Sequence, residues 1–306
     1  VPALQARLAS VVQPLDQALL DDRVADVSDA GLARWIAAQL EVPGLQRAAV
    51  QSTDRQGAVV DSQGRVTLWR RYRFQSAHRL PNVPPGHKCG RMHGHGFEAI
   101  VHVRADDAAL SHDRIDDAWA PLHLQLNYRC LNEIEGLDNP TSELLSSWLW
   151  RQLQPTLPGL SGVTVFETAS CGAHFDGRDW RIWKDFTFDS ASILRHAPEG
   201  DARRFLHGHT YLLRLHLHAP LDARMGWAVD FGDVKTLFTP VFNAVDHRPL
   251  HEIAGLEDGD CTTLARWIHA HGRERLPPLE RVDLYETRGC GVELGSGAMD
   301  RPCLPL

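Results

Sequence analysis

Apolar and polar residues alternate along two stretches of the chain, FEAIVHVRA at 97–105 and YLLRLHLHA at 211–219. A period of two is typical of a half-buried strand in an antiparallel sheet. Elsewhere the apolar positions recur every three or four residues, as in VKTLFTPVFNAV at 234–245, and this period predicts an amphipathic helix. Together these patterns predict an α+β fold with paired helices on one face of an antiparallel sheet.

The predicted helices and strands repeat along the chain. Three helical runs contain a tryptophan and precede a β-rich segment: AGLARWIAAQL (30–40) before AAVQST, TSELLSSWLWR (141–151) before VTVFET, and TTLARWI (262–268) before VDLYET. Asn139-Pro140-Thr141, followed by Glu143, predicts the start of the middle helix, with Asn or Thr as its cap.

A strand preceding the helices repeats as well. It reads RVTLWRRYRFQSAH at 65–78 and DWRIWKDFTFDSAS at 179–192, and His-Gly-His follows each, at 93–95 and 207–209. The unit is therefore two strands, a helical region and two more strands, about 115–120 residues long. Full copies are predicted at 65–180 and 181–306, and residues 1–64 are predicted to be the back half of a third copy.

Composition narrows the class of protein. The 306 residues are 43% hydrophobic and 23% charged, an ordinary globular mixture. The chain has no apolar run of about 20 residues and no basic leader, so neither a membrane span nor a signal peptide is expected. A net charge of −7 argues against broad nucleic-acid binding. Six scattered cysteines without a C-x-x-C pair indicate a reducing compartment, and we expect a cytoplasmic protein.

Three histidines in FQSAHRLPNVPPGHKCGRMHGHGFE (74–98) predict a metal site. His93 and His95 lie two apart on a predicted strand, so their side chains share a face. His78 ends the preceding strand, and antiparallel pairing can bring it alongside. Three imidazoles with one open position are typical of catalytic zinc. His216 and His218, spaced in the same way, are interpreted instead as a solvated strand face.

Cys89 precedes His93 by four residues, with Lys88 and Arg91 nearby. Cationic neighbours and a metal favour the thiolate form of a cysteine. From spacing alone Cys89 can be a fourth zinc ligand, an inert thiol or a general base.

The stretch RYRFQSAHRLPNVPPGHKCGRMHGHGFE, followed by LNEIEGLDNPTSELLSSWLW and VFET, resembles the 6-pyruvoyltetrahydropterin synthase superfamily, most of all its 6-carboxytetrahydropterin synthase branch of queuosine biosynthesis. The likeness is almost continuous over 65–180. The second copy is similar more loosely, through MGWAVDFGDVK, VDHRPLHEI and LYET.

The resemblance implies repeated tunnelling-fold modules, each an antiparallel four-stranded sheet with two helices. It implies Zn²⁺ on His78, His93 and His95, with Cys89 as a thiolate acid/base. A glutamate of the Glu-Thr motif, Glu167 or Glu286, would anchor the pterin, and we prefer Glu167. An Asp-His pair would shuttle protons.

The two full copies depart from the family pattern in complementary ways. The first reads Asn127-Tyr128-Arg129 where the Asp-His-Arg motif is expected, whereas the second retains Asp246-His247-Arg248.

The zinc and thiol positions show the opposite pattern. The second copy has Ser192 in place of the first histidine and Arg203 in place of Cys89, and it retains only His207 and His209. We therefore predict one composite site per chain, with metal and thiolate from 65–180 and Asp246-His247 from the second copy. Decay of both copies is the alternative.

The resemblance also implies the reaction. The substrate would be 7,8-dihydroneopterin triphosphate, and the products 6-carboxytetrahydropterin, acetaldehyde and triphosphate. A 6-pyruvoyl product and a non-catalytic pterin-binding or structural homologue are the alternatives. The family's trimeric rings predict a pseudo-trimeric chain that pairs as a homodimer, with no nucleic-acid or membrane partner.

Overall fold

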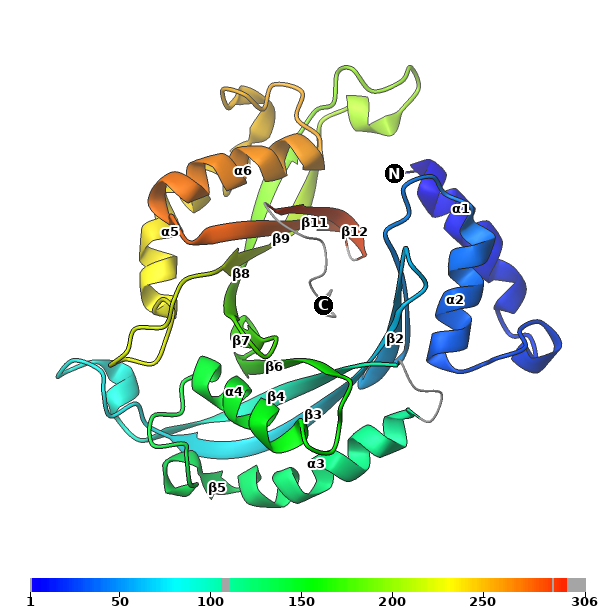
Figure 1. Cartoon of the computed structure of the whole chain (residues 1–306). Coiled ribbons are helices and arrows are strands. Elements are labelled where there is room, and N and C mark those ends of the chain that lie inside the picture. Colours follow the sequence, from blue (N-terminus) through cyan, green and yellow to red (C-terminus); the bar gives the residue numbers. More distant parts are fainter. Residues whose placement is uncertain (1, 106–109, 288, 296–306) are drawn as a thin grey trace. The chain divides into compact units, whose positions relative to one another are not determined.

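The computed structural model describes residues 2–105, 110–287 and 289–295 (Figure 1). It divides into two compact units. Unit 1 comprises residues 1–168, 173–179 and 223–226, and unit 2 comprises 169–172, 180–222 and 227–306. Both units combine helices with antiparallel strands, so the predicted α+β class is confirmed.

Among the described residues of unit 1, antiparallel strands pair in the order β1-β2-β3-β4-β6. They are β1 (Arg47–Thr53), β2 (Gln56–Asp61), β3 (Val66–His78), β4 (His93–Arg104) and β6 (Leu160–Thr168). A short strand, β5 (Arg129–Cys130), pairs in parallel with the end of β3. The next strand, β7 (Cys171–Phe175), follows β6 in the sequence.

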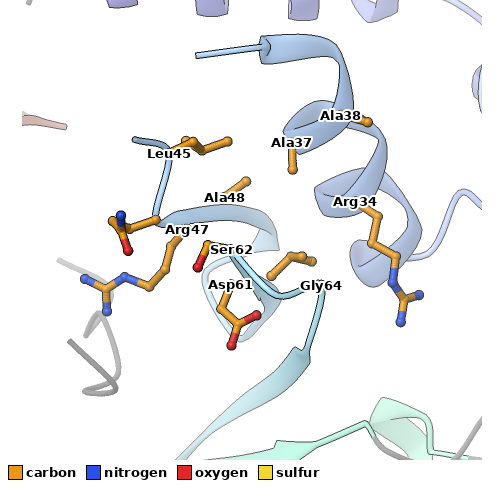
Figure 2. Close-up of a pocket in the computed structure, with 11 residues that line it drawn as sticks. Arg34, Ala37, Ala38, Leu45, Arg47, Ala48, Asp61, Ser62 and Gly64 are labelled. Carbon is orange, nitrogen blue, oxygen red and sulfur yellow. The ribbon is translucent and has the colours of Figure 1, made fainter. Parts of the chain in front are cut away.

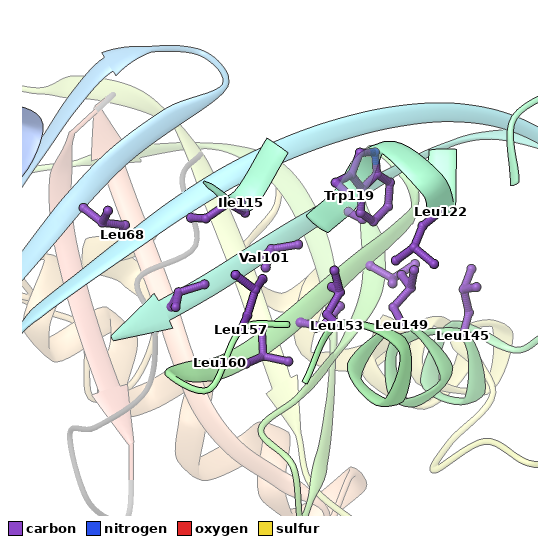
Figure 3. Close-up of a cluster of buried hydrophobic side chains, with 14 of the residues drawn as sticks. Leu68, Val101, Ile115, Trp119, Leu122, Leu145, Leu149, Leu153, Leu157 and Leu160 are labelled. Carbon is purple, nitrogen blue, oxygen red and sulfur yellow. The ribbon is translucent and has the colours of Figure 1, made fainter. Parts of the chain in front are cut away.

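The α-helices in the described part of unit 1 are α1 (Pro2–Val12), α2 (Asp29–Leu40), α3 (His112–Leu126) and α4 (Ser142–Leu153). Thr141 is the N-cap of α4, and its Oγ1 accepts a hydrogen bond from the backbone N–H of Leu144, as the capping prediction required. Leu145, Leu149 and Leu153 of α4 join Trp119 and Leu122 of α3 and the inner residues of β3 and β4 in one buried cluster (Figure 3). This apolar layer fixes α3 and α4 on one face of the sheet.

Unit 2 repeats the plan with an antiparallel sheet in the order β8-β9-β11-β12. Its strands are β8 (Trp180–Ser192), β9 (His207–Leu217), β11 (Leu279–Thr287) and β12 (Cys290–Gly295), and β10 (Arg248–Pro249) pairs in parallel with β8. Helices α5 (Phe231–Val245) and α6 (Cys261–Arg275) lie on one side of β8, β9 and β11 (Figure 1). Phe238 of α5 and Ile268 of α6 are fully buried.

The interpretation of His216 as a solvated residue is wrong. His216 is buried, and its Nε2 lies 2.8 Å from Oδ2 of Asp283, which Arg281 also contacts. Alternation along a strand shows which face a side chain takes, but it does not show that the face meets water. His218, at the strand end, is exposed as expected.

Within the described residues, no helix is both long enough and apolar enough to cross a bilayer.

Candidate metal and pterin site

The register of β3 and β4 gathers three imidazoles in unit 1. His78 pairs directly with His93, and His95 pairs with Ser76 two residues along the ladder. The ring centroid of His78 lies 4.6 Å from that of His93 and 5.2 Å from that of His95. Glu167, near the end of β6, joins them, with its Oε1 3.4 Å from Nε2 of His95. One ligand atom from each of the four residues lies within 4.8 Å of the others.

Backbone carbonyls orient two of the rings. The carbonyl of Pro140 lies 3.0 Å from Nδ1 of His78, and that of Arg91 lies 2.7 Å from Nδ1 of His93. A carbonyl only accepts, so each Nδ1 carries the proton and each Nε2 keeps its lone pair for a ligand. This is the usual arrangement of metal-binding histidines.

The cluster fits a metal ion chemically. Nε2 of His78 and Nε2 of His95 are buried and make no hydrogen bond within the described chain. Buried polar atoms are ordinarily paired, and a cation supplies the partner that these lone pairs require. Burial lowers the pKa of both histidines more than the carboxylate of Glu167 raises it, so the neutral, ligating form is favoured.

Glu167 is held from its other side as well. The hydroxyl of Ser142, the first residue of α4, donates to its Oε2 over 2.6 Å. Glu167 therefore lies beside the imidazoles with one oxygen fixed by the helix start. The residue that the sequence predicts as pterin anchor therefore lies in the same cluster as the predicted metal ligands.

Cys89 lies half-buried in a one-turn helix, η3 (Lys88–Gly90). Its N–H donates to Nδ1 of His87, and its carbonyl accepts from the N–H of Leu80 over 2.8 Å. Among the described residues, the group that could hold a metal consists of the three histidines and Glu167, and Cys89 lies outside it. This arrangement does not favour Cys89 as a fourth ligand, and its acid/base role stays a prediction.

Asp246 and His247 form a tight pair in unit 2. Nδ1 of His247 lies 3.0 Å from Oδ1 of Asp246, and the ring is 77% exposed. The two residues form a corner at the end of α5, and Asp189 fixes it. The N–H of Asp189 donates to Asp246, and its carbonyl accepts from the N–H of His247. Burial raises the pKa of Asp246, but the Asp189 N–H and the imidazole outweigh it, and the net pKa is lowered.

The first copy builds the same corner from different side chains. Asn127 accepts from the N–H of Gln75 at 2.9 Å, and the N–H of Tyr128 donates to the Gln75 carbonyl at 2.6 Å. Tyr128 and His247 share a left-handed backbone, with φ of +57° and +54°. The backbone of the motif is thus retained in the first copy, whereas its acid/base side chains are not.

The metal half of the second copy is altered in a matching way. Ser192 pairs with His207 in the register where His78 pairs with His93. Arg203 occupies the central position of the one-turn helix η5 (Ala202–Arg204), as Cys89 does in η3. Glu286 accepts from the thiol of Cys290 at 3.8 Å. Within the described residues, these side chains do not form a metal-binding group.

The strand pairs β3–β4 and β8–β9 each carry a hollow on their surface. One of about 600 Å³ in unit 1 is lined by residues that include His95, Tyr128 and Arg129. The equivalent hollow in unit 2, of about 570 Å³, includes His209, His247 and Arg248. The histidine position of the motif, Tyr128 in the first copy and His247 in the second, therefore lines a hollow in each copy.

The segment 1–64, which the sequence predicts to be a partial copy, differs from both full copies at this position. Ser52 stands where the other copies have glutamate, and it donates to Asp29, the first residue of α2, at 3.0 Å. A separate hollow of about 380 Å³ lies between α2 and the β1–β2 hairpin, with Arg34 and Arg47 extending from opposite sides (Figure 2). A carboxylate that could anchor a pterin is absent from this Glu-Thr position.

The orienting groups were missed by sequence reasoning. Pro140 and Ser142 flank the predicted cap Thr141, and their sequence positions indicate a helix start and nothing more. The carbonyl of Pro140 is a backbone group, which no residue type reveals.

Comparison with known proteins assigns the family. The profile of the family described as 6-pyruvoyl tetrahydropterin synthase matches residues 67–178 and 181–296, more than half of the chain, and the chain belongs to this family. A 6-carboxy-5,6,7,8-tetrahydropterin synthase of Synechocystis is 31% identical over 119 residues, which are 35% of this chain and 91% of that protein.

Two further proteins are similar. A dihydroneopterin monophosphate aldolase of Pyrococcus furiosus is 32% identical over 117 residues, 37% of this chain and 96% of the relative. The structure of Caenorhabditis elegans 6-pyruvoyl tetrahydropterin synthase matches 38% of this chain and 95% of its own, with a TM-score of 0.36 and 18% identity.

Proposed function

We propose that this chain is a zinc-dependent lyase built from tunnelling-fold modules. It converts 7,8-dihydroneopterin triphosphate and water into 6-carboxy-5,6,7,8-tetrahydropterin, acetaldehyde and triphosphate. The observation that carries the proposal is the cluster of His78, His93, His95 and Glu167, inside a chain of the 6-pyruvoyl tetrahydropterin synthase family.

The three imidazoles would hold Zn²⁺ through Nε2 of His78 and His95 and a nitrogen of His93. When bound, the metal supplies Lewis-acid stabilisation to hydroxyl oxygens of the substrate side chain. The carbonyls of Pro140 and Arg91 keep two of the imidazoles in the ligating tautomer. Burial around His78 also keeps competing water away from its ring.

Glu167 would anchor the pterin. An ionised carboxylate accepts two hydrogen bonds from the amino group and ring N–H of a pterin in a fork geometry. Glu167 lies beside His95 and accepts a hydrogen bond from Ser142, which supports an anchor next to the proposed metal ligands. This position favours Glu167 over Glu286, whose copy lacks a metal-binding group among the described residues.

Cys89 and the Asp246-His247 pair would move protons. In this proposal the Cys89 thiolate acts in one transfer and His247 in the other, with Asp246 orienting the imidazole. Asp246 contacts Nδ1 of His247, so Nε2 is the nitrogen available to exchange a proton. The composite site, one per chain, draws these groups from the two full copies.

We also propose that two pseudo-trimeric chains pair as a homodimer in the cytoplasm. The partner surfaces would be the module faces that stack in the family. Light scattering checks this directly, because a monomer at micromolar concentration contradicts the pairing.

The decisive experiment is incubation of the zinc-loaded protein with 7,8-dihydroneopterin triphosphate, with products identified by mass. The proposal expects 6-carboxytetrahydropterin and acetaldehyde. A 6-pyruvoyl product would move the chain to the sister activity. Turnover restricted to dihydroneopterin monophosphate would favour the aldolase activity named for the Pyrococcus relative. Intact substrate would favour a binding or structural protein.

Single substitutions test the composite site. Cys89→Ala and His247→Ala should each lower kcat at least about 100-fold, because general acid–base groups contribute on that order. His218→Ala, which removes an exposed histidine of unit 2, is the control. Unchanged turnover in His247→Ala beside an inactive Cys89→Ala would contradict the composite arrangement.

The glutamates form a matched pair of substitutions. Glu167→Gln replaces one acceptor oxygen with a donor and should raise KM strongly, whereas Glu286→Gln should change KM little. The reverse result would move the pterin anchor to the second copy.

A further inference from the structure

A four-residue loop from the second copy belongs to unit 1. Residues 223–226 follow β9 and precede α5 in the sequence, yet they pack within unit 1. Three consecutive carbonyls of the loop accept side-chain hydrogen bonds there. Asn82 donates to Arg224 at 2.9 Å, Asn139 to Met225 at 2.7 Å and Thr141 to Gly226 at 2.7 Å.

The residues that receive the loop also support the metal cluster. Asn139 and Thr141 are buried and bracket Pro140, whose carbonyl orients His78. Ser142, the next residue, donates to Glu167. The segment 139–142 therefore contacts the loop through two side chains and the cluster through a carbonyl and a hydroxyl.

Gly226 is required for the close fit. Its φ is +74°, and a Cβ built on it would lie 2.6 Å from Cδ1 of Leu144 and 2.9 Å from Nδ2 of Asn139. A side chain there must displace the ends of the Leu144 and Asn139 side chains, and a shift of the Asn139 amide would disturb its hydrogen bond to the carbonyl of Met225.

We propose that residues 223–226 are a positioning element for the metal cluster. The loop fixes segment 139–142, which in turn fixes the ring of His78 and the carboxylate of Glu167. This inference rests on the proposed function only in taking the cluster as a zinc site. The second copy would then support that site through the backbone carbonyls of this loop, in addition to contributing Asp246 and His247.

Loss of a partner that orients metal ligands typically weakens metal affinity about 10–100-fold. Gly226→Ala should therefore weaken zinc binding by that factor, measured by competition with a chromophoric chelator. It should also shift the visible spectrum of the Co²⁺-substituted protein, because His78 and Glu167 change orientation. Both measurements omit the pterin, so they report on the site without turnover.

Gly64→Ala is the matched control. Gly64 has a φ of +78°, and its Cβ would meet nothing within 4 Å, so this variant adds left-handed strain without displacing a neighbour. Equal zinc affinity and equal Co²⁺ spectra in the two variants would overturn the positioning role. Wild-type protein that binds no zinc would overturn this inference and the metal part of the proposed function together. Normal zinc binding without pterin turnover would contradict the proposed function alone.

A second pair keeps the test decisive should Gly226→Ala fail to fold. Thr141→Ser retains the hydroxyl that donates to Gly226 and caps α4, and it should bind zinc as the wild type does. Thr141→Asn retains a capping acceptor but changes the donor that meets the loop, and it should lose affinity. Wild-type affinity in both variants would contradict the inference.

Discussion

His93 and His207 occupy equivalent places in two hairpins, but their neighbours differ. His93 pairs across the ladder with His78, whereas His207 pairs with Ser192. Each has its Nδ1 close to the carbonyl two residues earlier, of Arg91 and Phe205. The local orientation of the ring is therefore the same, and the third imidazole decides whether the site can hold a metal.

This comparison predicts the metal stoichiometry. The wild type should bind one zinc ion per chain with high affinity. His93→Ala should weaken binding by more than the factor of about 10–100 that loss of an orienting partner brings. His207→Ala, the matched control, should leave it unchanged. Chelator competition and elemental analysis measure both values, and a second zinc lost with His207→Ala would contradict this account.

Helices α3 and α5 end in a corner that the two copies share. Ser76 of β3 donates to the carbonyl of Leu126 at 2.7 Å, and Ser190 of β8 donates to that of Val245 at 2.5 Å. These carbonyls belong to the last turn of each helix, where no intrahelical donor remains. The residues that follow, Tyr128 and His247, take left-handed backbones. The serine therefore fixes the place where the Asp-His motif begins.

Removal of this hydroxyl should destabilise each corner. Ser76→Ala and Ser190→Ala leave a buried carbonyl without its donor, which costs about 1–3 kcal/mol in the free energy of unfolding. Urea denaturation should show similar losses in the two variants, since both bonds occupy the same place in the repeat. Ser190→Ala should also lower kcat through displacement of His247, whereas Ser76→Ala should not.

A loss in one variant alone would show that the corners are not energetically equivalent. Full turnover in Ser190→Ala would show that the hydrogen bond from Ser190 does not position His247 for catalysis.

The sequence predicted the elements better than the contacts between them. Periodicity located α5 and the strands around His78 and His93, because core-facing side chains must recur at the period of the element. The repeat also showed that Ser192 and Arg203 occupy the positions equivalent to His78 and Cys89. The loop at 223–226 could not be foreseen, because its contacts use backbone carbonyls. The proximity of Ser142 and Glu167 depends on packing of α4 on β6, which no local pattern encodes.

Across the whole molecule, polar groups are buried at equivalent places on the sheets. His102 of β4 contacts Thr164, and Thr164 contacts His174. In unit 2, His216 lies at the corresponding ladder position and contacts Asp283. Burial lowers the pKa of His102 well below its usual value, and the neighbouring His174 lowers it further. Burial likewise lowers the pKa of His216, more than Asp283 raises it.

These histidines make the stability of the chain depend on pH. The unfolded chain takes up protons at His102 and His216 below about pH 6.5, whereas the folded chain does so only at lower pH. The free energy of unfolding should therefore keep its highest value above that pH and fall on acidification. Each such histidine contributes a slope of about 1.4 kcal/mol per pH unit until its folded pKa is reached.

His102→Gln tests the slope, because the amide can still bond Thr164 but does not titrate. Its unfolding free energy, measured by urea denaturation from pH 7.5 to 5, should fall less steeply than that of the wild type by up to about 1.4 kcal/mol per unit. His218→Gln, which replaces an exposed histidine outside these buried contacts, is the control. Parallel curves for all three proteins would mean that His102 already titrates alike in the folded and unfolded chain, and burial would then not control its charge.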